Sequence, residues 1–188
     1  MFEFPCVILA GGQSRRMGKD KALLPFKEAP TLAWYQVHRL RPHFSALYLS
    51  AKEDKFGFDT PLIADEGEEF APTVALATIL KKLDTPWVAV VAVDIPLVGP
   101  EVFAALWAAK ASGDAAVVPV ADGQIHTMCA LYHRSFLPLL EAAVAKGHHK
   151  LTRLLEESQT RFVTFEDPTV FANLNHPGEY TALTGTQP

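Results

Sequence analysis

The stretch CVILAGGQSRRMGKDK, from Cys6 to Lys21, begins with a short apolar run and continues into three glycines and four cationic side chains. Its apolar run, 7–10, has the length and composition of a buried strand. Glycines directly after a strand allow positive backbone φ angles and bring N–H groups close to a bound group. Nearby cations can neutralise a polyphosphate locally. These cations are Arg15, Arg16, Lys19 and Lys21. The segment therefore favours nucleotide binding at the exit of a first strand.

The spacing of this segment excludes two common phosphate-binding motifs. Gly12 and Gly18 are too far apart for a G-x-x-x-x-G-K-[ST] loop, and Lys21 is followed by Ala22 instead of serine or threonine. No G-x-G-x-x-G pattern opens the chain either, which disfavours a dinucleotide-dependent oxidoreductase. A glycine-rich turn with solvated arginines and lysines is the alternative to a nucleotide site.

Short apolar runs alternate with segments of helical periodicity along the rest of the chain. This alternation predicts βαβ units and a mostly parallel sheet with helices on both faces. No repeat or linker divides the sequence, so we expect a single α/β domain over 1–188, doubly wound and Rossmann-like. The expected strands are 7–10, 46–50, 61–64, 87–93, 115–120, 128–133 and 161–165. The expected helices are 31–40, 74–83, 100–111, 135–146 and 150–157, with surface loops at 66–71 and 122–124.

The overall charge is mildly acidic, with 17 Lys+Arg against 21 Asp+Glu and a pI near 6.0. Such a chain has no global field to attract nucleic acid or a membrane surface, so a bound anion must be held locally. Cys6 and Cys129 lie in apolar segments, as buried thiols in a reducing compartment do. No basic signal region and no run of ~20 apolar residues is present, and we expect a cytoplasmic protein.

Two aspartates end apolar runs at positions where a parallel sheet presents ligand-binding residues. Asp94 closes VAVVAVD, and an ionised carboxylate beside a buried strand is costly without a cationic partner. Mg²⁺ is one such partner, because one carboxylate with waters and phosphate oxygens is enough to hold it. Capping of the turn that contains Pro96 is an equal alternative. Asp65 closes PLIAD in the same way and has a plain loop aspartate as its alternative.

The segment LAGGQSRRMGKDKALLPF, 9–26, resembles the signature of the cofactor-type nucleotidyltransferases and is especially similar to that of the molybdenum cofactor guanylyltransferases. That signature reads approximately L-A-G-G-x-S-x-R-M-G-x-D-K-x-L-L. The resemblance implies that the backbone around the strand exit binds the nucleotide and that nearby cations reach its phosphates. The implied nucleotide-binding residues are Leu9, Ala10, Gly11, Gly12 and Lys21, with Arg15 as a second phosphate contact.

The same resemblance assigns roles to the later aspartates. The Asp-x-Pro element at Asp94 matches the metal-binding aspartate of the family, which implies Mg²⁺ as the cofactor. Asp65 stands where the family uses an aspartate with the nucleotide. Ser50 replaces an asparagine that commonly follows the second long strand, and it retains a hydroxyl for the nucleotide. The implied catalytic residues are Lys21, Arg15 and Asp94.

The tail NLNHPGEY, from Asn173 to Tyr180, resembles the N-x-N-x-P-E element of the family, with Pro177 at the start of a last helix. Amide side chains donate and accept, so Asn173 and Asn175 can bridge a ligand or orient metal-bound waters. Their ordinary alternative is an Asx turn that caps the helix.

Two further places are candidates for the acceptor. His126 lies where the family commonly has a His-Pro pair, with Thr127 in place of the proline. Lys150 belongs to a basic cluster that can hold an acceptor phosphate or can simply be a solvated face. The other members of that cluster are His148, His149 and Arg153.

One segment departs from the family pattern. Residues 71–75, APTVA, stand where the family usually has a G-P-L-x-G turn, and both glycines are missing. A backbone conformation that depends on those glycines can differ here. The departure weakens the prediction of guanine specificity more than the prediction of the fold.

The resemblance implies transfer of GMP from GTP to the terminal phosphate of molybdopterin, with release of pyrophosphate. The implied partners are GTP, molybdopterin and proteins that hand over the cofactor. A related transferase that uses CTP on molybdopterin, or a nucleoside triphosphate on a sugar phosphate, is one alternative. A nucleotide-binding module without turnover is another, and the missing glycines are its main support.

Overall fold

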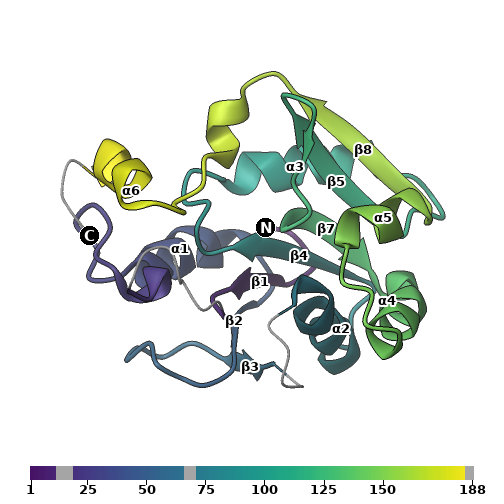
Figure 1. Ribbon diagram of the computed structural model, residues 1–188, viewed down its shortest axis with the longest axis horizontal. Coiled ribbons are helices and arrows are strands. Elements are labelled where there is room, and N and C mark those ends of the chain that lie inside the picture. The colour runs from purple at the N-terminus through teal and green to yellow at the C-terminus, as the bar shows by residue number, and fades with distance from the viewer. Residues whose placement is uncertain (12–18, 66–70, 185–188) are drawn as a thin grey trace.

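The chain folds around one mixed β-sheet (Figure 1). The structure is a computed structural model that describes residues 1–11, 19–65 and 71–184. Its strands are β1 (Cys6–Leu9), β2 (Leu47–Ala51), β3 (Leu62–Ala64), β4 (Trp87–Ala92), β5 (Ala116–Ala121), β6 (Gln124–Ile125), β7 (Cys129–His133) and β8 (Thr160–Phe165). Its α-helices are α1 (Leu32–Leu40), α2 (Pro72–Lys82), α3 (Pro100–Ala109), α4 (Leu137–Ala145), α5 (Leu151–Glu156) and α6 (Pro177–Thr184). Short 3₁₀ turns are η1 (Lys21–Leu23), η2 (Arg41–His43), η3 (Arg134–Phe136) and η4 (Pro168–Phe171).

The sheet has the order β3-β2-β1-β4-β7-β5-β6, and β8 pairs with β5. The first four strands run parallel to one another, and β8 is parallel to β5. Strand β7 is antiparallel to both β4 and β5, and β5 and β6 form an antiparallel hairpin. The predicted α/β class is confirmed. Because β1 to β4 are parallel, their carboxyl ends meet at one edge of the sheet, where ligands bind in folds of this kind.

Two apolar cores cover the two faces of the sheet. Alternate residues of β1 serve both, with Cys6 and Ile8 in one core and Val7 in the other. Helices α1 and α3 pack in the first core, and α2, α4 and α5 pack in the second (Figure 1). The helices therefore lie on both faces, as predicted. Within the described ranges, none of the helices has the length and apolar character that crossing a membrane requires.

Local sequence explains where two of the helices begin and end. Thr31 is the N-cap of α1, and its Oγ1 accepts a hydrogen bond from the Trp34 backbone N–H at 3.1 Å. Helix α4 ends at Ala145, and Gly147 follows the C-cap Lys146 with a φ of 67°, in the left-handed region that glycine favours. The N–H groups of Gly147 and His148 donate to the carbonyls of Val144 and Ala143, which closes a Schellman motif.

The expected surface loop at 122–124 is the tight turn of the β5–β6 hairpin. Asp122 and Gly123 both have positive φ angles, 48° and 71°. Two successive residues with positive φ form the turn that matches the twist of a two-residue hairpin. The two-residue strand β6 was too short to give a periodic signal in the sequence.

Candidate functional site

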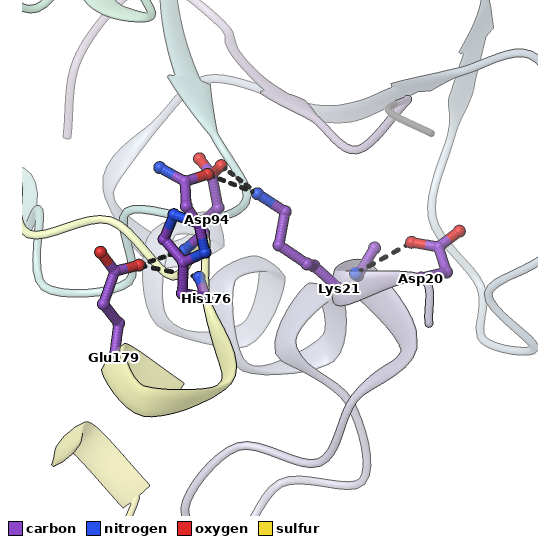
Figure 2. Close-up of polar contacts among 7 residues, drawn as sticks. Asp20, Lys21, Asp94, His176 and Glu179 are labelled. Atoms are coloured by element: carbon purple, nitrogen blue, oxygen red, sulfur yellow. Dashed lines mark hydrogen bonds and ion pairs between the residues drawn. The ribbon is translucent and has the colours of Figure 1, made fainter. Parts of the chain in front are cut away.

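The edge formed by the parallel strand ends carries a polar cluster of Lys21, Asp94 and Asn175, called the lysine cluster below. Lys21 Nζ donates to Asp94 Oδ2 at 2.6 Å and to Asn175 Oδ1 at 2.9 Å (Figure 2). The side chains of Lys21 and Asp94 are 16% and 20% exposed, so their ion pair is shielded but reachable from solvent. Three predicted site residues that are far apart in the sequence therefore meet at one point.

The placement of Lys21 follows from its neighbours in the sequence. Asp20 is the N-cap of η1, and its Oδ1 accepts a hydrogen bond from the Ala22 backbone N–H at 3.0 Å. Ala22 is buried and fixes the turn against the core. In the consecutive pair Asp20-Lys21, the first residue caps the turn and the side chain of the second extends from it to Asp94 (Figure 2).

Asp94 is held by backbone contacts on two sides. The N–H of Val93, just after β4, donates to the Leu9 carbonyl at 3.0 Å, which ties this turn to the exit of β1. The Asp94 carbonyl accepts a hydrogen bond from the Leu174 N–H at 2.8 Å, which ties it to the C-terminal segment. The carboxylate itself contacts Lys21, and the site role of Asp94 stays a prediction.

A buried glutamine and a half-buried arginine on α1 support the loop after Asp94, and the sequence interpretation missed them. Gln36 is fully buried, and its Nε2 donates to the Ile95 carbonyl at 3.2 Å. Arg39 donates to Gln36 Oε1 at 2.9 Å and also to the Val98 carbonyl. Burial lowers the pKa of Arg39 below its usual range. The one signal in the sequence is an amide on an otherwise apolar helix face.

The C-terminal segment frees Asn175 for the lysine cluster. Glu179 Oε2 accepts hydrogen bonds from the backbone N–H groups of Asn175 at 2.6 Å and His176 at 2.9 Å (Figure 2). Burial alone would raise the pKa of Glu179, but these hydrogen bonds outweigh it and the pKa is lowered. A glutamate in the first turn therefore caps α6, and the Asn175 side chain is left to accept from Lys21.

A second cluster lies at the ends of β1, β2 and β3, and we call Gly11, Ser50 and Asp65 the glycine cluster. Ser50 is buried, and its Oγ donates to Asp65 Oδ1 at 2.5 Å. A Cβ atom on Gly11 would lie 2.8 Å from Asp65 Oδ2 and 3.2 Å from the Ala51 Cα. Close approach is therefore why glycine stands here. Gly11 is not among the described glycines with positive φ, so the backbone freedom that glycine allows is not what this position uses.

The remaining nucleotide-binding predictions divide between described and undescribed residues. Leu9 is the last residue of β1, and the Ala10 N–H donates to the Ser50 carbonyl at 2.8 Å. Both therefore adjoin the glycine cluster. Gly12 and Arg15 lie outside the described residues, and their assigned roles stay predictions.

The predicted acceptor residues are dispersed. His126 stacks on Phe171 of η4, with ring centroids 4.2 Å apart and an interplanar angle of 17°. Burial lowers the pKa of His126, and among the described residues its buried Nε2 has no hydrogen-bond partner. Asn173 is exposed two residues after Phe171, so His126 and the tail adjoin each other. Lys150 is exposed at the N-terminus of α5.

One member of the basic cluster at 148–153 is tied to α2. His149 Nδ1 lies 2.7 Å from the Oγ1 of Thr73, which is fully buried in the first turn of α2. Thr73 belongs to the segment that departs from the glycine-containing family pattern. Thr73 therefore has a specific contact, which sequence reasoning did not anticipate.

The described side chains offer a metal one carboxylate rather than a complete site. Residues 1–11, 19–65 and 71–184 contain no group of three or more His, Cys, Asp or Glu side chains that could hold a metal ion. Asp94 nevertheless fits a divalent cation that substrate phosphates complete, because Mg²⁺ commonly keeps only one or two carboxylate ligands. Its contact with Lys21 shows that the carboxylate accepts a cation in this position.

The sequence and the fold of this chain are similar to those of known proteins. Residues 6–162 match the MobA-like NTP transferase domain. The molybdenum cofactor guanylyltransferase of Campylobacter jejuni subsp. jejuni serotype O:6 is 36% identical over 180 residues, 95% of this chain and 94% of the relative. The Vibrio cholerae serotype O1 protein of the same name is 32% identical over 188 residues, 97% of this chain and 92% of the relative.

A solved structure shows the same fold. The crystal structure of molybdopterin-guanine dinucleotide biosynthesis protein A from Archaeoglobus fulgidus matches with a TM-score of 0.83 at 20% identity and covers 97% of each chain. The matched domain and the similarity along nearly the whole sequence show that this chain belongs to the MobA-like NTP transferase family and is a nucleotidyltransferase.

Proposed function

We propose that this chain transfers GMP from GTP to the terminal phosphate of molybdopterin and releases pyrophosphate. Relatives named molybdenum cofactor guanylyltransferase align along almost the whole chain, which supports this assignment. The observation that carries it is the contact of Lys21 with both Asp94 and Asn175. That contact gathers a cation, a carboxylate and an amide at the strand ends, where a triphosphate can meet all three.

The two clusters divide the nucleotide between them in this proposal. The glycine cluster, together with Leu9 and Ala10, holds the base and ribose, because Asp65 presents a carboxylate that accepts hydrogen bonds from such groups. Lys21 and Arg15 contact the phosphates, which need cationic partners. Gly12 completes the set of predicted nucleotide-binding residues.

The lysine cluster must exchange partners when the nucleotide binds. Without a nucleotide, Lys21 and Asp94 neutralise each other. A bound triphosphate offers Lys21 a stronger anion, so the ammonium moves from the carboxylate to the phosphates. Asp94 then becomes available to hold a cation of the substrate complex.

Nucleotidyltransferases of this family generally use a divalent metal, and we propose Mg²⁺ with Asp94 as its protein ligand. When bound, such an ion neutralises charge on the incoming and departing phosphate oxygens. Asn175 is placed beside Asp94, where its amide can orient water or a phosphate oxygen.

The transfer itself is an in-line displacement at phosphorus. An oxygen of the terminal molybdopterin phosphate forms a bond to the α-phosphorus, and the bond to the bridging α–β oxygen breaks. Pyrophosphate leaves with that electron pair. The attacking oxygen is already an anion, so no general base is needed, and the protein contributes alignment and neutralisation of charge.

The acceptor lies on the side of the C-terminal segment in this proposal. His126 stacks there on Phe171, two residues before Asn173, and Asn175 links that segment to Lys21. The uncharged, partly buried imidazole of His126 can donate or accept one hydrogen bond at its unpartnered Nε2. Lys150, at the N-terminus of α5, stays a predicted contact for the acceptor phosphate. Two buried free cysteines suit a reducing compartment, and a cytoplasmic location is part of the proposal.

A nucleotide panel tests the proposed function. Pyrophosphate release is measured for the purified chain with Mg²⁺, molybdopterin and each of the common nucleoside triphosphates. Release with GTP and molybdopterin together is the expected result. Release with CTP, or with a sugar phosphate as the acceptor, would replace the proposed substrates, and binding without release under every condition would replace the activity.

A further inference from the structure

Asp20 and Lys21 are adjacent residues whose side chains are anchored on different segments. Lys21 extends to the lysine cluster, whereas Asp20 Oδ2 forms an ion pair with Lys55 Nζ. Lys55 lies in the connection between β2 and β3, which supplies no residue to the proposed site. The Lys55 and Asp20 side chains are 21% and 29% exposed, so salt screens this pair less than a fully exposed one.

The two oxygens of Asp20 have separate tasks. Oδ1 accepts from the Ala22 N–H and so begins the turn that carries Lys21, while Oδ2 contacts Lys55. The ammonium of Lys55 also lies 5.6 Å from the centroid of the Phe56 ring, and Phe56 is buried. Lys55 is therefore held by its own segment as well as by Asp20, which makes it a fixed support.

We propose that Lys55 is a positioning residue for Lys21 and acts through Asp20. It fixes the carboxylate that caps η1, and it neutralises a negative charge one residue away from the cation that binds phosphate. Without Lys55, the Asp20 carboxylate can turn toward Lys21 and repels a triphosphate, and both effects weaken nucleotide binding. The inference rests on the proposed function, since that function gives Lys21 a triphosphate to bind.

The experiment measures the affinity of the full chain for GTP with Mg²⁺ by isothermal titration calorimetry, without acceptor. K55M keeps the aliphatic length of lysine and removes its charge, and K55R restores the charge. D20N keeps an oxygen that can cap η1 and removes the negative charge. K81M is the matched control, because Lys81 is an exposed lysine in the last turn of α2 and belongs to neither cluster.

K55M is expected to weaken GTP binding about tenfold, K55R by less than about threefold, and K81M not at all. In the D20N background, K55M is expected to weaken GTP binding no more than about twofold, because position 20 then has no carboxylate that Lys55 could fix or neutralise. This loss of the Lys55 effect distinguishes action through Asp20 from direct contact with the nucleotide.

Two results would overturn the inference: K55M binding GTP as tightly as K81M does, or K55M weakening binding equally with and without D20N. A lowered melting temperature with unchanged GTP affinity would also reduce Lys55 to a structural role. If the wild type binds GTP but releases no pyrophosphate with molybdopterin, the proposed function fails. The ratios of the binding constants still decide the role of Lys55 in that case.

Discussion

The lysine cluster and the glycine cluster lie at the same edge of the sheet but offer a ligand different chemistry. The lysine cluster joins side chains from η1, the end of β4 and the C-terminal segment. Its cation, Lys21, can exchange the Asp94 carboxylate for a bound phosphate. The glycine cluster joins neighbouring strand ends and holds a carboxylate through a buried hydroxyl. Changes in the lysine cluster should therefore act on turnover as well as on phosphate binding, whereas changes in the glycine cluster should act mainly on nucleotide affinity.

Removal of the carboxylate from the lysine cluster should have the largest effect. Asp94→Ala is expected to lower kcat by about 10³-fold or more, because the divalent ion loses its protein ligand at the transferring phosphate. Pyrophosphate release measures the effect, and circular dichroism checks the fold. Asp84→Ala is the control, since that side chain is 96% exposed and forms only a surface ion pair with Arg134. Normal release by a folded Asp94→Ala protein would contradict the assignment.

Loss of the cation should come next. Lys21→Met is expected to lower kcat/KM for GTP by about 10²-fold, through weaker phosphate binding and poorer neutralisation in the transition state. Steady-state kinetics with varied GTP measure it. The double variant Lys21→Met/Asp94→Ala should have nearly the same kcat/KM for GTP as Asp94→Ala alone, because both residues act on the transferring phosphate. Unchanged GTP kinetics in Lys21→Met would remove Lys21 from the site.

The glycine cluster should respond in KM instead of kcat. Gly11→Ala places a methyl group 2.8 Å from Asp65 Oδ2, so the carboxylate must shift away from its hydrogen bond with Ser50. We expect KM for GTP to rise about tenfold and kcat to change less than about threefold. Gly178→Ala is the control, because a Cβ there meets nothing within 4 Å. An equal fall in kcat would show that the two clusters do not divide the nucleotide as proposed.

The smallest effect should come from Glu179, which is not in the lysine cluster but holds the backbone of Asn175. Its folded-state pKa lies below the ordinary 4.5, so its hydrogen bonds stabilise the fold above the unfolded-state pKa. That contribution is lost as pH falls through the lowered folded-state pKa. Between neutral and acidic pH, the free energy of unfolding measured with urea should therefore fall more steeply for the wild type than for Glu179→Gln. Glu141→Gln, on the exposed side of α4, is the control. Identical pH profiles for all three proteins would contradict the role of Glu179.

Much of the fold follows from patterns that the sequence displays. Short apolar runs separated by helical segments predicted the sheet and the helices on both faces, and Thr31 and Gly147 mark helix ends by well-understood local chemistry. The antiparallel course of β7 was not predictable, because an apolar run has the same composition in either direction. The hairpin at Asp122 and Gly123 was expected only as a loop, since its second strand is two residues long.

The candidate site was predictable where a motif or a strand end marks it. Lys21, Asp94 and Asn175 were named from the sequence, and the structure brings them together. The supporting residues Gln36 and Lys55 were not found, because their roles depend on contacts across 59 and 35 positions of the chain. A single glutamine or lysine carries no signal of such a distant partner.

A crystal structure with Mg²⁺ and an unreactive GTP analogue would show directly whether Lys21 and Asp94 hold the triphosphate and its metal. We predict that Lys21 Nζ moves from Asp94 to the phosphates, that Asp94 binds the metal beside them, and that Asp65 faces the base and ribose. A nucleotide bound elsewhere, with Lys21 still on Asp94 and no phosphate near either residue, would contradict it.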